Sequence, residues 1–223
     1  MRDYIQKVLM PRLLVAWFAS RWSGKLWAWL LRRLGGRVCV ELYFAFDDPY
    51  SVVALPLLEV AERRRADLTL YPIIERGVDD DPALEQRSRF ALEDSRRLLR
   101  RRGLALRRAK PLRPGDVAFL AEWTESLREP RQRQAFAATA LTRLWLSSSG
   151  PVQRGDYAML YRKVTGQTPP TADAVLTQRL AANRERQLRK GHWESPAARV
   201  QGEWFFAHER IPQIEERLSY LGW

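Results

Sequence analysis

A strand–helix–strand pattern between residues 37 and 74 constrains the fold more than any other feature of the sequence. Residues 37–46 form an apolar, β-rich run typical of a buried strand, and the run stops at residues 47–49. A helical pattern with one apolar face follows over residues 50–65, and residues 67–74 read as a second strand. This spacing is typical of a βαβ unit, in which the two strands are parallel.

A long helical block and a short hairpin complete the predicted order of elements. Residues 82–190 are mostly helical in pattern, with breaks at Gly103, residues 111–115, Pro130, residues 147–151 and residues 166–170. Two strand patterns then flank Gly202, and a last helix is expected over residues 211–221. The order predicts an α/β, thioredoxin-like fold with a four-stranded mixed sheet and a helical insertion at about residues 82–190.

Cysteine and histidine are too scarce for several kinds of site. The chain has 223 residues, enough for one sizeable core with an insertion. Cys39 is its one cysteine, so a disulfide within the chain, a CxxC pair and a cysteine-based zinc set are all excluded. His192 and His208 are its two histidines, which argues against a histidine-rich metal site, and no metal is expected.

The net charge of +12 is concentrated in two segments. Residues 1–37 carry eight basic residues and one acid, and residues 96–110 carry eight basic residues and no acid. Such segments can meet anionic lipid or nucleic acid, or can be solvated helix faces. Residues 96–110 lack the interleaved aromatic side chains that stack on bases, so nucleic acid is disfavoured as a partner.

Residues 1–36 are predicted to be a basic amphipathic helical extension, followed by one domain over residues 37–223. Arg12, Arg21 and Lys25 interrupt any apolar run near the roughly 20 residues that a transmembrane helix needs. Four tryptophans lie among these basic residues, at positions 17, 22, 27 and 29. Two interpretations remain open: the segment lies on an anionic membrane surface, or it packs on the body of the protein. The expected location is cytoplasmic, with the inner face of the membrane as the surface concerned.

Three motifs in the domain resemble those of one known family. The first is Val40-Glu-Leu-Tyr-Phe-Ala-Phe-Asp-Asp-Pro-Tyr-Ser51, the second is Gly191-His-Trp-Glu-Ser-Pro196, and the third is Gly202-Glu-Trp-Phe-Phe-Ala-His-Glu-Arg210. In order and spacing they are similar to the motifs of the 2-hydroxychromene-2-carboxylate isomerase family, with its kappa-class glutathione transferase and DsbA relatives. The resemblance implies a DsbA-like thioredoxin fold and, if the chain is an enzyme, a glutathione-linked isomerase or transferase.

The resemblance also assigns the candidate site. It implies glutathione as the cofactor, a small aromatic substrate, and a cis-proline at Pro196 with Ser195 beside the cysteinyl part of glutathione. The implied catalytic positions are Asp48 and Ser51. The implied binding positions are Pro49, Tyr50, Ser195, Pro196, Glu209 and Arg210. Two questions stay open. Glu209 and Arg210 could form only a surface ion pair that caps the last helix, and the chain could form a homodimer.

Asp48 departs from the family pattern, which has serine there to hold the glutathione thiolate and cysteine in the DsbA branch. Because Asp48 and Ser51 stand at both cysteine positions of that branch, disulfide exchange is not expected. A carboxylate about 4 Å from a thiolate would oppose it by up to about 4 kcal/mol at an effective dielectric constant near 20. Asp48 could instead be a general base, a grip for a cationic group, or only the N-cap of the next helix. The alternative to an enzyme is a catalytically silent binding module, which could bind at a membrane surface.

Overall fold

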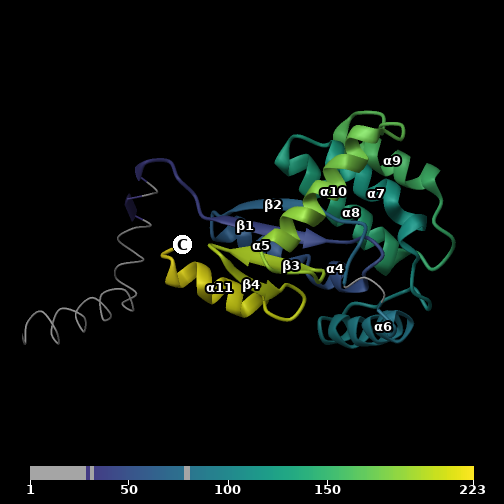
Figure 1. Ribbon diagram of the computed structural model, residues 1–223, viewed down its shortest axis with the longest axis horizontal. Helices are drawn as coiled ribbons and strands as arrows, with labels where there is room; N and C mark the ends of the chain where they lie inside the picture. The colour runs from purple at the N-terminus through teal and green to yellow at the C-terminus, as the bar shows by residue number, and fades with distance from the viewer. Residues whose placement is uncertain (1–28, 31–32, 78–80) are drawn as a thin grey trace, which may run out of the picture.

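The computed structural model describes residues 29–30, 33–77 and 81–223, and its centre is a four-stranded mixed sheet (Figure 1). The strands are β1 (Cys39–Phe44), β2 (Asp67–Pro72), β3 (Ala197–Val200) and β4 (Glu203–Phe206), in the order β2-β1-β3-β4. β1 and β2 are parallel, whereas β3 is antiparallel to both of its neighbours. The predicted parallel pair, mixed sheet and terminal hairpin are therefore confirmed.

Both faces of β1 are buried, which explains its continuous apolar sequence. Val40, Leu42 and Phe44 point into the main core on one face. On the other face Tyr43 is fully buried and stacks on Tyr71 of β2 with ring centroids 4.8 Å apart. Helices on both sides of the sheet shield these faces from water.

The helix predicted over residues 50–65 is wrong in one respect, because two helices occupy this stretch. They are α4 (Pro49–Val53) and α5 (Pro56–Arg63). Each begins with a proline, which lacks the N–H group that a helix interior needs but is well suited to the first helical position. Pro56 therefore starts a new helix instead of continuing the first.

In the described part of the chain between β2 and β3, the structure has five α-helices and one π-helical turn. They are α6 (Leu84–Arg101), α7 (Pro114–Ser126), α8 (Pro130–Thr142), η2 (Arg143–Ser147), α9 (Arg154–Thr165) and α10 (Ala174–Arg189). Prolines start α7 and α8, and Gly166 ends α9 with a φ of 71°. α7, α8 and α9 pack together, whereas α6 lies apart from them, beside α4 (Figure 1).

The last helix, α11 (Ile211–Tyr220), packs against α5 and β3. The C-terminal part of α10 crosses the opposite face, where Lys190 binds Glu41 of β1 and Arg186 lies over the ring of Tyr71. This arrangement leaves the end of β1, the start of α4 and the segment before β3 close together. Those three pieces carry the candidate site.

The predicted N-terminal extension falls mostly outside the described residues. In the part that is described, Trp29, Leu30 and Leu34 are exposed. No helix of the described ranges combines the length and apolar character needed to cross a bilayer.

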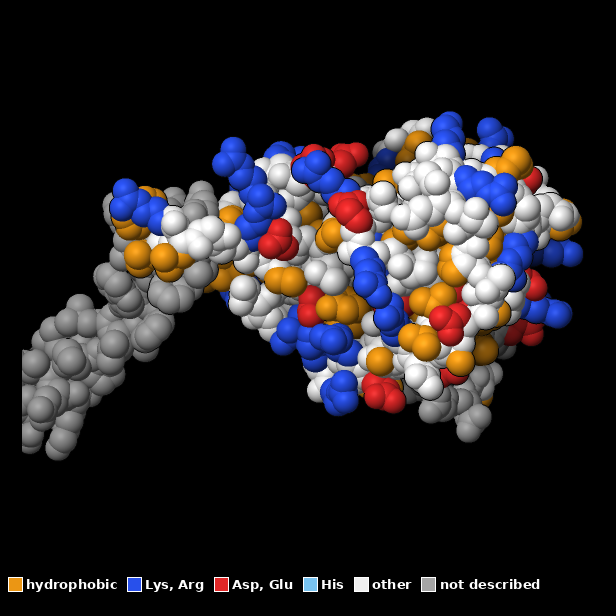
Figure 2. Space-filling model, turned by 90° about the horizontal axis from the view of Figure 1, so that it is seen from above, with side chains coloured by type: hydrophobic (Ala, Val, Ile, Leu, Met, Phe, Trp, Pro, Cys, Tyr) orange, Lys and Arg blue, Asp and Glu red, His pale blue; other side chains and the backbone are white. Residues whose placement is uncertain are grey.

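The second basic segment, residues 96–110, is less uniformly solvated than its sequence indicates. Arg102 donates to the Val53 carbonyl, Arg108 donates to the Leu144 carbonyl at 2.8 Å, and Arg96 donates to the Arg108 carbonyl at 3.2 Å. Figure 2 shows Lys and Arg side chains spread over one face of the molecule with Asp and Glu among them. Part of the basic charge of this segment is therefore engaged with backbone carbonyls of the protein itself.

Candidate functional site

The turn from β1 into α4 places Asp48 at the N-terminus of α4. Its Oδ1 atom accepts a hydrogen bond from the backbone N–H of Tyr50 at 3.0 Å, so Asp48 is the N-cap of this helix. The residue is fully buried, and its other carboxyl oxygen, Oδ2, has no hydrogen-bond partner. Burial of a carboxyl group with one oxygen that makes no hydrogen bond destabilises its charged form, so the protonation state of Asp48 matters.

Burial raises the pKa of Asp48 to about 6, and the repulsion of Asp47 adds to the shift. Arg76 and the Tyr50 N–H group act in the opposite direction, because both stabilise the carboxylate. Asp48 can therefore gain or lose a proton close to neutral pH, which an ordinary surface aspartate cannot do.

Arg76, which follows β2 in the chain, is the cation beside both carboxyl groups. Its Nε atom donates to Asp47 Oδ2 at 3.1 Å, and both side chains are largely buried. Burial alone would lower the pKa of Arg76, but Asp48 and Asp47 together raise it. One guanidinium thus faces two buried acids, and this imbalance favours protonation of one of the acids.

Ser195 lies against Asp48 from the segment before β3. The Ser195–Pro196 peptide bond is cis, as the sequence predicted. The hydroxyl of Ser195 lowers the pKa of Asp48, although Ser195 Oγ and Asp48 Oδ2 have no conventional hydrogen-bond partner. Within the described part of the chain, no hydrogen bond uses the backbone N–H or C=O of Ser195. These groups are available to a ligand.

Tyr50 and His208 form an aromatic pair next to Ser195. Their rings stack with centroids 3.9 Å apart, and the Tyr50 hydroxyl donates to Asp94 of α6 at 3.1 Å. Burial lowers the pKa of His208, so its imidazole is neutral at pH 7, and burial raises the pKa of Tyr50, so its phenol keeps its proton.

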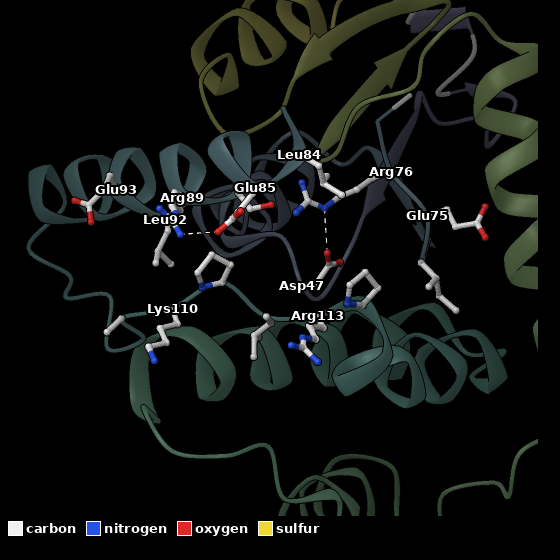
Figure 3. Close-up of a pocket in the computed structure, with 16 residues that line it drawn as sticks. Asp47, Glu75, Arg76, Leu84, Glu85, Arg89, Leu92, Glu93, Lys110 and Arg113 are labelled. Atoms are coloured by element: carbon white, nitrogen blue, oxygen red, sulfur yellow. Dashed lines mark hydrogen bonds and ion pairs between the residues drawn. The ribbon is translucent and has the colours of Figure 1, made fainter. Parts of the chain in front are cut away.

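Two cavities open beside these residues. The first, of about 590 Å³, is lined by residues that include Tyr50, Arg87, Phe90, Ser195, His208 and Glu209. The second, of about 1170 Å³, lies between α6 and residues 109–114 (Figure 3). Arg76 and Leu84 line both cavities. Figure 3 shows Arg76 bonded to Asp47 at the second cavity.

The structure groups some of the predicted site residues and separates others. Tyr50, Ser195 and Glu209 share the first cavity. Asp48, Pro49 and Ser51 are buried beneath it, where Ser51 Oγ accepts from the Ala45 N–H at 3.3 Å. The Pro196 carbonyl accepts from Ala207 N–H at 3.0 Å, directly beyond the paired ends of β3 and β4.

Arg210 is exposed and lies outside the residues that line either cavity. It is the N-cap residue of α11, and its side chain makes no capping hydrogen bond. Residues 207–210 form the turn into α11, and this turn directs His208 and Glu209, but not Arg210, toward the cavity.

Sequence reasoning did not identify Arg76, Phe90, Phe206 or His208 as site residues. His208 lies inside the third motif, between the residues that carry the resemblance. Its position in the motif could therefore have identified it as a site residue. Arg76 and Phe90 come from segments with no distinctive pattern. Among the described residues, no three His, Cys, Asp or Glu side chains come together as a metal site.

Several solved structures share this architecture, and two of them illustrate the likeness. A 2-hydroxychromene-2-carboxylate isomerase superposes with a TM-score of 0.63 at 13% sequence identity, over 82% of this chain and 95% of that chain. A probable DsbA oxidoreductase from Streptomyces coelicolor gives a TM-score of 0.60 at 12% identity, over 83% of this chain and 90% of that chain. The sequence matches no protein-family model and no curated protein. At these identities the likeness concerns the fold, and the chain has the DsbA-like thioredoxin fold with a helical insertion.

Proposed function

We propose that the chain is a glutathione-linked isomerase or transferase for a small aromatic substrate, with its site at the first cavity. The observation that carries this proposal is the position of Ser195. It lines a cavity of about 590 Å³, its backbone hydrogen-bonding groups are unused in the described structure, and its side chain lies against Asp48. An extended thiol peptide such as glutathione can pair with such a backbone segment.

Asp48 is the proton acceptor in this proposal. A carboxylate with a pKa of about 6 is better matched to proton transfer near neutral pH than an unperturbed aspartate. The S–H bond of the thiol, or a C–H bond of the substrate, breaks as an O–H bond forms at Ser195 Oγ, and the proton that Ser195 Oγ releases forms the O–H bond on Asp48. Proton transfer to the carboxylate also removes the charge repulsion that a thiolate would otherwise meet. Because Asp48 lines neither cavity, Ser195 is the residue that connects it to a ligand.

The second candidate is a binding module without catalysis, and one observation favours it. Asp48 is closed off from both cavities, and neither cavity is lined by a cysteine among the described residues. In this candidate Asp48 is only the N-cap of α4. The basic segment of residues 1–36 would then direct the module to an anionic membrane surface.

The substitution Asp48→Ser separates the two candidates. We expect wild-type kcat/KM with glutathione and a neutral aryl halide, 1-chloro-2,4-dinitrobenzene, to rise with pH through about 6, as Asp48 loses its proton. Asp48→Ser should abolish this rise of kcat/KM with pH and lower kcat/KM by about 10²-fold or more, because serine caps the helix but cannot accept the proton. The same rates without glutathione show whether the thiol is needed.

Asp173→Ser is the matched control, since Asp173 is an exposed N-cap whose side chain accepts from the Val175 N–H at 2.9 Å, on α10. It should leave the profile unchanged. A higher rate in Asp48→Ser would mean that Asp48 opposes the thiolate and would exclude the base role. Glutathione binding by calorimetry without turnover in either protein would support the binding module.

A further inference from the structure

The arginines of the first cavity are already committed to acids of the protein. Arg87 contacts Asp81 at 3.1 Å and Glu194 at 3.0 Å, so one cation serves two carboxylates. Arg76 contacts Asp47 and faces Asp48 as well. The positive charge of each guanidinium is therefore already balanced by carboxylates of the protein.

Glu209 adds to the excess of acids. The one ionisable partner within 4 Å of its carboxylate in the described structure is His208, at 3.8 Å, and the lowered pKa of His208 leaves that ring neutral at pH 7. The Glu209 side chain is about half exposed at the cavity. The described lining therefore carries more negative than positive charge, in a chain whose net charge is +12.

Aromatic side chains form the apolar part of the same cavity. Phe90 of α6 is 63% exposed and Phe206 of β4 is 44% exposed, although both line the cavity. The stacked rings of Tyr50 and His208 also line this cavity, and the ring centroids of His208 and Phe206 are 6.2 Å apart. Large exposed aromatic side chains around a hollow are a feature of binding sites rather than of an inert surface.

We propose that this cavity binds an arylalkyl ammonium compound, with the ammonium group at Glu209 and the aromatic ring against Phe90 and Phe206. Carboxylates accept the N–H donors of a primary ammonium, and aromatic faces attract a cation through their quadrupole. The chain as a whole repels cations at long range, so such selectivity must come from the cavity itself. A volume of about 590 Å³ accommodates a ligand of this size.

The inference deepens the proposed function, because it names the chemical class of the second substrate at the same cavity. Glutathione also carries an ammonium group, so the two sources of that group must be measured separately. Glutathione binding without amine binding would overturn this inference and leave the proposed function in place. Amine binding without glutathione binding would overturn the proposed function and leave this inference in place.

The experiment on the wild-type chain uses three ligands that share a phenyl ring. Phenethylamine is cationic, phenethyl alcohol is neutral and 3-phenylpropionate is anionic at pH 7. We expect phenethylamine to bind at least about tenfold more tightly than the other two, measured by calorimetry. Equal affinities, tighter binding of 3-phenylpropionate, or no binding of any of the three would overturn the inference.

Two variants locate the site. Glu209→Gln should weaken phenethylamine binding about fivefold to tenfold, and Phe90→Ser should weaken phenethylamine and phenethyl alcohol alike. Both side chains are exposed enough for the fold to tolerate the changes, which thermal unfolding by circular dichroism checks. Glu85→Gln is the control, since Glu85 is an exposed acid that lines the second cavity. If Glu209→Gln and Glu85→Gln have the same effect, the amine does not bind where we propose.

Discussion

At the scale of single residues, Asp48 combines two roles that are usually separate. It caps α4 like many aspartates at helix N-termini, but it is fully buried, and its second carboxyl oxygen lacks a hydrogen-bond partner. The cap follows from the sequence, since an aspartate directly before a helix-starting proline is a common N-terminal signal. The burial does not follow from the sequence, because it depends on Ser195 and Arg76, which approach from distant parts of the chain.

The raised pKa of Asp48 predicts how stability depends on pH. The folded-state pKa of about 6 lies above the ordinary value of 3.8, so between these values the folded chain binds more protons than the unfolded chain. The free energy of unfolding should therefore fall as pH rises from about 4 to about 6, by up to about 3 kcal/mol from this group. Asp48→Asn keeps the capping oxygen and should remove this contribution.

Urea unfolding of wild type and Asp48→Asn at several pH values measures the effect. The difference in free energy of unfolding between the two proteins should change across the window from pH 4 to pH 6 and be constant on either side. Asp173→Asn, at the exposed N-cap of α10, should show no such change. A constant difference between wild type and Asp48→Asn at all pH values would contradict the assigned pKa.

At the scale of elements, α6 is the helix that connects the inserted helices to the site. It packs beside α4, and Leu92 and Leu99 are among its buried side chains. Two polar contacts also hold it in place: Tyr50 donates to Asp94 at 3.1 Å, and Arg87 contacts Glu194 at 3.0 Å. Because α6 contributes Phe90 to the first cavity and Arg89 to the second, its position sets the shape of both.

Asp94→Ala should loosen α6 locally. Loss of the hydrogen bond to Tyr50 costs about 1 kcal/mol, which corresponds to about fivefold faster amide hydrogen exchange if α6 opens separately. The amides of α10 should be unaffected. Arg89→Gln removes an exposed ion pair with Glu85 on the same helix and should change exchange little. Faster exchange in α6 and α10 to the same extent would show that α6 does not open on its own.

Local patterns predicted the elements, but not the contacts that build the site. The parallel pair, the helical insertion and the hairpin were visible because strand and helix periodicities differ and because prolines mark where helices begin. The break between α4 and α5 was missed because the apolar positions continue across Pro56. Arg76 reaches Asp47 only because β2 pairs with β1, and His208 reaches Tyr50 only because the β3–β4 hairpin pairs beside β1. Such contacts between distant segments leave no periodic signal.

At the scale of the whole molecule, the basic residues fall into two groups. Some bind other groups of the protein, and others lie in the N-terminal segment. Arg102 and Arg108 bind backbone carbonyls, and Arg87 and Arg76 bind acids at the site. The basic residues of 1–36 are different in sequence, because they lie among tryptophans and leucines with one acid. In the described part of that segment Trp29 is 49% exposed and Leu34 is 82% exposed, and Arg33 lies over the Trp29 ring at 4.5 Å.

We therefore expect the full chain to bind anionic vesicles through residues 1–36. Basic side chains near an anionic surface contribute about 1 kcal/mol each, and exposed tryptophan and leucine side chains can enter the interface. Binding to vesicles that contain phosphatidylserine, measured by co-sedimentation, should weaken as salt is added and should be much weaker for neutral phosphatidylcholine vesicles.

Replacement of Arg21, Lys25, Arg32 and Arg33 by glutamine in the full chain should reduce vesicle binding by at least about tenfold, and deletion of residues 1–36 should abolish it. The matched control replaces Arg97, Arg100 and Arg101 by glutamine on α6. These residues belong to the second basic segment but have no cluster of tryptophans beside them. If the α6 variant loses as much binding as the N-terminal variant, net charge alone explains the attraction. If deletion of residues 1–36 leaves binding intact, the segment is not a membrane-binding element.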